Sequence, residues 1–183
     1  VSIGHLEGLK SLDNIVEEKA SICSGQTQKG LAIIPSGIEK FSQLKAKVRG
    51  FGPNVISFGD DESSDVRISA IEVSGNAITS TIVDQKQKSW NVNLKTAGRH
   101  YMKNAAGLLA LVSSLNLDLS KAILSLQSWS PLAGRGQVLE VKLKASDYRK
   151  TIYLIDESYN ANPSSVKSSL ETLACIFTNK KGK

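Results

Sequence analysis

The chain has 183 residues, of which 40% are hydrophobic and 22% are charged, so it can bury the core of a globular domain. This length suits one domain, or one domain and part of another. No apolar run approaches the ~20 residues of a membrane helix, so we expect no membrane span. The net charge of +6 comes from scattered lysines, which favours a solvated surface and no nucleic acid partner. Two distant cysteines match no metal spacing and suggest a reducing compartment, consistent with a cytoplasmic location.

The first third of the chain is predicted to form a helix followed by a β-α-β unit. After an opening loop at 4–8, Ser11 can cap a helix whose apolar positions follow the helical period. A short buried strand at 31–35, a helix over 38–48 and a second strand at 55–59 come next. This order implies that the two strands pair in parallel.

The middle of the chain changes to short strands and then to helices. Three strands are expected, at 66–70, 77–83 and 88–94. Turn residues separate them, which is typical of an antiparallel meander. Helices are expected over 104–115 and again after Asp118 or Ser120, and a Pro- and Gly-containing boundary follows at 130–137.

The last part of the chain contains a strand, a polar loop and a helix. Beyond the boundary, strands are expected at 138–143 and 151–155. Asp156 and Glu157 end the second strand, where ligands collect in α/β sheets. Asn162-Pro163 suits the cap and first residue of a helix that ends near residue 179. A helix N-terminus facing an acidic, Asn-rich loop can position a polar ligand such as a nucleotide, although a well-capped turn alone explains the same residues.

Four segments resemble motifs of the Mur ligase family, in the family's order. Residues 156–163 resemble the DDSYNANP box of the MurF branch, which adds D-alanyl-D-alanine to UDP-N-acetylmuramoyl-tripeptide. The others resemble AHLEGFGS…AKGEIF at 5–22, GRHNVxNAxAA at 98–106 and PxxGR at 131–135. The resemblance covers nearly the whole chain, and the four ordered motifs together indicate the family more strongly than any one of them.

The resemblance implies an ATP- and Mg²⁺-dependent ligase that forms an amide through an acyl phosphate. In the family, the residue matching His5 binds the metal, and the residue matching Lys19 is commonly carbamylated, so that its carbamate helps to hold the same ion. An ammonium cannot ligate Mg²⁺, whereas a carbamate supplies the hard oxygen it prefers. Arg135 matches an arginine that reaches the ATP phosphates, so Lys19 and Arg135 are the expected catalytic residues.

The resemblance also implies the nucleotide and substrate contacts. Asn104 is expected to face adenine, while Tyr101 occupies the position of a second family asparagine. Either Asp156 or Glu157 is expected to bond the ribose hydroxyls, because Glu157 replaces the usual second aspartate. The residues expected to shape the substrate site are Tyr159, Asn160 and Asn162.

The implied fold is α/β: the later part of a central ATPase domain, with a mixed sheet and an antiparallel section, and the start of a Rossmann-like C-terminal domain. We expect an N-terminally truncated central domain at 1–133 and a truncated second domain at 134–183. No G-x-x-x-x-G-K-[ST] loop occurs in the chain, so the isolated chain is expected to be inactive. The resemblance also leads us to expect a monomer for the full-length enzyme. The alternatives are another Mur ligase, a folylpolyglutamate-synthase-like ligase, or a non-catalytic nucleotide-binding fragment.

Overall fold

A mixed five-stranded sheet is the largest element of the computed structural model, which describes residues 6–145 and 148–178. Its strands are β1 (Leu31–Pro35), β2 (Asn54–Gly59), β3 (Val66–Ser74), β4 (Ala77–Asp84) and β5 (Ser89–Leu94), in the order β1-β2-β3-β4-β5. β1 pairs with β2 and β2 with β3 in parallel, whereas β3–β4 and β4–β5 are antiparallel. The predicted β-α-β unit and meander are therefore both confirmed, and they form one sheet.

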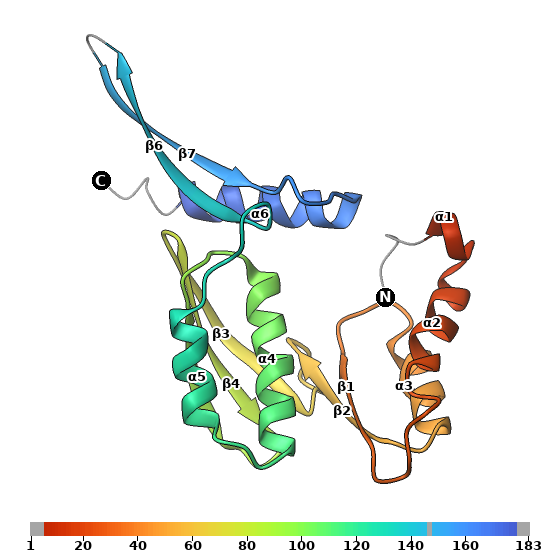
Figure 1. The fold of residues 1–183 in the computed structure, drawn as a ribbon. Coiled ribbons are helices and arrows are strands. Elements are labelled where there is room, and N and C mark those ends of the chain that lie inside the picture. Colours follow the sequence, from red (N-terminus) through yellow and green to blue (C-terminus); the bar gives the residue numbers. More distant parts are fainter. Residues whose placement is uncertain (1–5, 146–147, 179–183) are drawn as a thin grey trace.

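Six helices accompany the strands in the described residues. They are α1 (Leu6–Leu9), α2 (Leu12–Ser21), α3 (Phe41–Gly50), α4 (Arg99–Ser114), α5 (Leu119–Ser128) and α6 (Pro163–Thr178) (Figure 1). The Ser11 and Asp118 side chains cap α2 and α5, accepting bonds from backbone N–H groups three residues on.

Three helix starts differ from the sequence prediction. Residues 6–9 form the short helix α1, where a loop was expected. Helix α3 begins at Phe41 and not near residue 38, because Lys40 takes a left-handed φ of 64°. Helix α4 begins at Arg99, five residues before the expected start, because Gly98 leads directly into it and Met102 is already fully buried.

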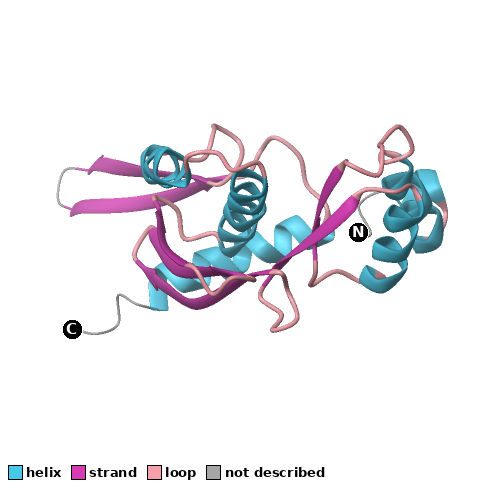
Figure 2. Ribbon diagram, turned by 90° about the horizontal axis from the view of Figure 1, so that it is seen from below, coloured by secondary structure: helices cyan, strands magenta, loops and turns pink. Residues whose placement is uncertain are grey.

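The helices cover the two faces of the sheet and create two hydrophobic clusters (Figure 2). Helix α4 and the strands β3, β4 and β5 enclose the larger cluster, which includes fully buried Ile78, Val92 and Leu109. Helices α2 and α3 pack on β1 around the smaller cluster, which contains Val16 and Val48. Aliphatic side chains fill most of both clusters, as expected from the low aromatic content.

A two-stranded antiparallel sheet and α6 form the last part of the chain, above the large sheet in Figure 1. The strands are β6 (Gln137–Ala145) and β7 (Tyr148–Asp156), each longer than expected. Helix α6 contacts α4 and β3, and its Ile176 is buried. The predicted boundary at 133/134 falls in the segment that connects α5 to β6. None of the helices in the described ranges is long and apolar enough to cross a bilayer.

Candidate functional site

Asp156 holds together the loop that follows β7. One carboxylate oxygen accepts the backbone N–H of Gly134 at 2.8 Å. The other accepts the Ser158 hydroxyl at 2.7 Å and the Ser158 N–H at 3.1 Å. The Ser158 hydroxyl, the Ser158 N–H and the Gly134 N–H together lower the pKa of Asp156 below its ordinary value. Asp156 therefore joins the connecting segment to the loop, and its oxygens are largely occupied.

Arg135 lies on a turn that this loop supports. Its neighbours Gly134 and Gly136 have φ angles of 75° and 85°, which favour glycine. The Gly136 N–H donates to the Asp156 carbonyl at 2.7 Å, and the Tyr159 N–H donates to the Gly134 carbonyl at 3.0 Å. A Cβ on Gly134 would lie 3.1 Å from the Tyr159 nitrogen, so the two backbones meet closely. This turn presents the exposed Arg135 side chain to solvent beside Tyr159.

Glu157 faces a polar cavity of about 290 Å³ between the N-terminal parts of α4 and α6. The residues that line it are His100, Glu157, Asn162, Ser164, Ser165, Ser168 and Ser169. The Glu157 Oε1 atom accepts the Ser169 hydroxyl at 2.9 Å. The buried His100 Nδ1 atom has no hydrogen-bond partner, and burial lowers the pKa of His100 while the nearby Glu157 charge opposes that shift. His100 is therefore a neutral imidazole beside an available carboxylate.

Asn162 caps α6 and also lines this cavity. Its side-chain oxygen accepts the Ser165 N–H at 3.0 Å, and its own N–H donates to the Ser165 hydroxyl at 2.9 Å. The predicted cap is confirmed. Tyr159 and Asn160 are exposed on the loop before it, and Tyr159 has 67% of its surface accessible.

Asn104 lines a second, mainly apolar pocket of about 250 Å³ on α4. Its walls include Tyr101 and Trp129, whose ring centroids are 4.9 Å apart, together with Leu94, Ala105, Leu108 and Leu126. Trp129 was not among the residues predicted from the sequence to form a site. Its position directly before the Pro- and Gly-containing boundary was the available signal. One amide among aromatic and aliphatic walls suits a flat ring with polar edges.

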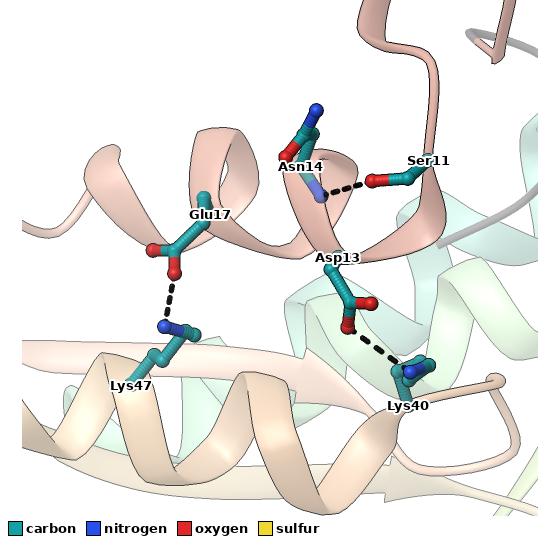
Figure 3. Close-up of polar contacts among 6 residues, drawn as sticks. All are labelled: Ser11, Asp13, Asn14, Glu17, Lys40 and Lys47. Atoms are coloured by element: carbon teal, nitrogen blue, oxygen red, sulfur yellow. Dashed lines mark hydrogen bonds and ion pairs between the residues drawn. The ribbon is translucent and has the colours of Figure 1, made fainter.

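Lys19 lies elsewhere, on α2. Two ion pairs fasten α2 to α3, Asp13–Lys40 at 3.0 Å and Glu17–Lys47 (Figure 3). The Lys19 ammonium is 3.1 Å from the Glu18 carboxylate, and its side chain borders an apolar cavity of about 410 Å³ beside β1. The lining of that cavity includes none of Asn104, Arg135 and Glu157.

The expected magnesium ligands are not seen as a cluster in the described part of the chain. No group of three or more His, Cys, Asp or Glu side chains that could hold a metal ion occurs there. His5 lies outside the described residues. An ammonium such as that of Lys19 supplies no lone pair, so its participation depends on carbamylation.

A model of the Mur ligase middle domain matches residues 1–112, and the chain therefore belongs to the Mur ligase family. The UDP-N-acetylmuramoyl-tripeptide–D-alanyl-D-alanine ligase of Rickettsia prowazekii is 23% identical over 174 residues, which are 94% of this chain and 37% of that protein. The UDP-N-acetylmuramate–L-alanine ligase of Halorhodospira halophila is 29% identical over 109 residues, covering 60% of this chain and 22% of that protein. Two different family members thus match at similar identity.

The solved structure of a MurF ligase from Thermotoga maritima in complex with ADP shares the fold. It superposes with a TM-score of 0.76 at 20% identity, covering 96% of this chain and 38% of that one. The expected α/β fold is therefore confirmed. The chain spans little more than one-third of the length of the Rickettsia relative.

Proposed function

We propose that the complete protein containing this chain is an ATP-dependent ligase that joins D-alanyl-D-alanine to UDP-N-acetylmuramoyl-tripeptide. The main support is the segment between α5 and β6. It carries Trp129, which lines the Asn104 pocket, and Arg135, and its Gly136 lies beside Glu157. In the proposed reaction, the γ-phosphoryl group of ATP passes to the substrate carboxylate and ADP leaves. The acceptor amine then attacks the acyl carbon, phosphate leaves, and the amine loses a proton.

The proposed position of adenine is the pocket of Asn104. The Asn104 amide can accept from and donate to the edge of a base, while Tyr101 and Trp129 supply apolar walls. The Arg135 guanidinium fork suits phosphate oxygens, and its exposed turn leaves it available for that contact.

Glu157 is the better candidate than Asp156 for the ribose hydroxyls. Three protein donors already occupy Asp156, whereas Glu157 accepts one serine hydroxyl and borders an open cavity. Asn162 shares that cavity, and Tyr159 and Asn160 lie on the loop before it. These three residues are the proposed substrate contacts.

We also propose His5 and carbamylated Lys19 as ligands of Mg²⁺. The ion, when bound, would neutralise phosphate charge during phosphoryl transfer. Carbon dioxide adds to the neutral amine of a lysine side chain and forms a carbamate, so mass spectrometry of the intact protein under carbon dioxide tests the modification of Lys19. The 134–183 segment is proposed to begin a C-terminal domain, and the full-length protein to be a cytoplasmic monomer.

The decisive experiment measures phosphate release by the complete natural protein with paired substrates. We expect release with UDP-N-acetylmuramoyl-tripeptide and D-alanyl-D-alanine, and none with UDP-N-acetylmuramate and L-alanine. The opposite preference would reassign the protein to the other family member it resembles. Release with neither pair would refute the proposal. The 183-residue chain alone is expected to be inactive, since its sequence contains no phosphate loop.

A further inference from the structure

Tyr101 joins the Asn104 pocket to the Arg135 turn. Its ring forms a wall of the pocket and contacts the rings of His100 and Trp129, with centroid distances of 4.0 and 4.9 Å. Its hydroxyl donates to the Arg135 carbonyl, 34 positions along the chain. One side chain from α4 therefore reaches the backbone of the segment that leads into β6.

The surroundings of the hydroxyl favour this bond. Burial and the Glu157 charge raise the pKa of Tyr101, with Arg135 opposing, so the hydroxyl keeps its proton and remains a donor at neutral pH. A Cβ on Gly136 would lie 3.4 Å from the Tyr101 oxygen and 3.2 Å from Glu157 Oε1. The backbone at Gly136 thus passes closely between the tyrosine and the glutamate.

The Arg135 turn is held from its other side by the β7 loop. The Gly134 and Gly136 N–H groups donate to the Asp156 side chain and carbonyl, and the Arg135 side chain lies over Tyr159. Those contacts fix the turn relative to the end of β7 and the loop that follows it. The Tyr101 bond fixes it relative to α4.

We propose that Tyr101 is a positioning residue, whose hydroxyl holds the Arg135 carbonyl so that the guanidinium stays at a set distance from the Asn104 pocket. The resulting bridge lets one ligand contact Asn104 and Arg135 together. The consequence for nucleotide binding rests on the proposed function. The restraint of the Arg135 backbone by the Tyr101 hydroxyl does not depend on that function.

This restraint is tested by trypsin, because trypsin cleaves at the carbonyl that Tyr101 holds. The Tyr101→Phe variant of the complete natural protein keeps the ring and loses the bond. We expect its initial rate of cleavage between Arg135 and Gly136, followed by mass spectrometry, to rise about fivefold, since one lost hydrogen bond shifts the opening equilibrium by that order.

Two controls accompany this measurement. Ser114→Ala removes a hydroxyl from α4 that donates to the Ala110 carbonyl at 2.6 Å and leaves the Arg135 bond in place, so cleavage at Arg135 should match wild type. Cleavage after Lys121 on α5, whose side chain is 84% exposed, should be equal in all three proteins. Equal cleavage at Arg135 in Tyr101→Phe and wild type would overturn the inference.

The functional consequence is tested by binding of adenosine and ADP to the same proteins. Tyr101→Phe should weaken ADP binding about fivefold and leave adenosine binding within about twofold, because the pocket wall remains while Arg135 is released. Equal weakening of both would show that the hydroxyl acts on the Asn104 pocket and not through Arg135, which would overturn the inference. If wild type binds neither probe, the proposed nucleotide site fails, and the trypsin comparison still decides whether Tyr101 restrains Arg135.

Discussion

The Arg135 guanidinium carbon lies 3.8 Å from the centroid of the Tyr159 ring. Both side chains are exposed, and the ring face directs the guanidinium without occupying its N–H donors. The pairing therefore orients the arginine and leaves it able to bind an anion.

Replacing Tyr159 tests this stacking. Tyr159→Leu should raise the Kd for ADP about two- to fivefold, because an exposed cation–π contact contributes about 0.5–1 kcal/mol. Tyr159→Phe retains the ring and should bind as wild type, as measured by titration calorimetry. Equal weakening in both variants would instead point to a role for the hydroxyl.

The Asn104 amide is predicted to select the base. Asn104→Leu should weaken ATP binding about five- to thirtyfold and reduce the preference for ATP over GTP, because the polar edge of adenine loses its partner. Competition binding with both nucleotides measures the preference. Asn93→Leu, at an exposed position of β5, is a matched control that should leave both affinities unchanged. An unchanged ATP preference in Asn104→Leu would place the base elsewhere.

Gly107 allows α4 to approach β2. A Cβ there would lie 2.8 Å from the Phe58 ring, so Gly107→Ala should lower the free energy of unfolding by about 1–2 kcal/mol, even though alanine favours the helix. Chemical denaturation measures the change. Gly50→Ala at the end of α3 meets no atom within 4 Å and should not destabilise. Combining Gly107→Ala with Phe58→Leu should recover part of the loss, and no recovery would mean that this contact is not its cause.

Asp65 ties the start of β3 to β2. It accepts both the N–H and the hydroxyl of buried Ser57 at 2.7 Å. Burial alone would raise the pKa of Asp65, but the bonds from Ser57 and Gln85 outweigh it and hold the pKa below its ordinary 3.8. The ionised form is therefore the one that the fold favours.

Asp65→Asn should lower the free energy of unfolding by about 1–2 kcal/mol at pH 7, because hydrogen bonds to a charged acceptor become bonds to a neutral one. A depressed pKa means that the unfolded chain takes up the proton first as pH falls. The wild-type advantage should therefore persist above about pH 4 and shrink below it. Asp61→Asn, an exposed carboxylate in the same loop, is the control. An advantage that stays constant through acid would contradict the assigned ionisation.

Local patterns predicted most of the elements. The Ser11, Asp118 and Asn162 caps each involve a donor three residues away, so the chain positions alone reveal them. Helical and alternating periods located the helices and strands because those periods record which side of each element is buried. The early start of α4 was not predicted because its first residues are polar. Met102 near that start is buried only because α4 packs against the sheet.

The sequence by itself determined the family motifs, the α/β pattern and the glycines that surround Arg135, since each depends on neighbouring residues. Only the tertiary structure shows that Asp156 accepts a hydrogen bond from Gly134, 22 positions away, while Glu157 borders a cavity. It also placed Lys19 beside a different cavity and the Tyr101 hydroxyl on the Arg135 backbone. Such contacts depend on how separate elements pack, and hydrogen bonds between distant segments leave no periodic trace in the chain.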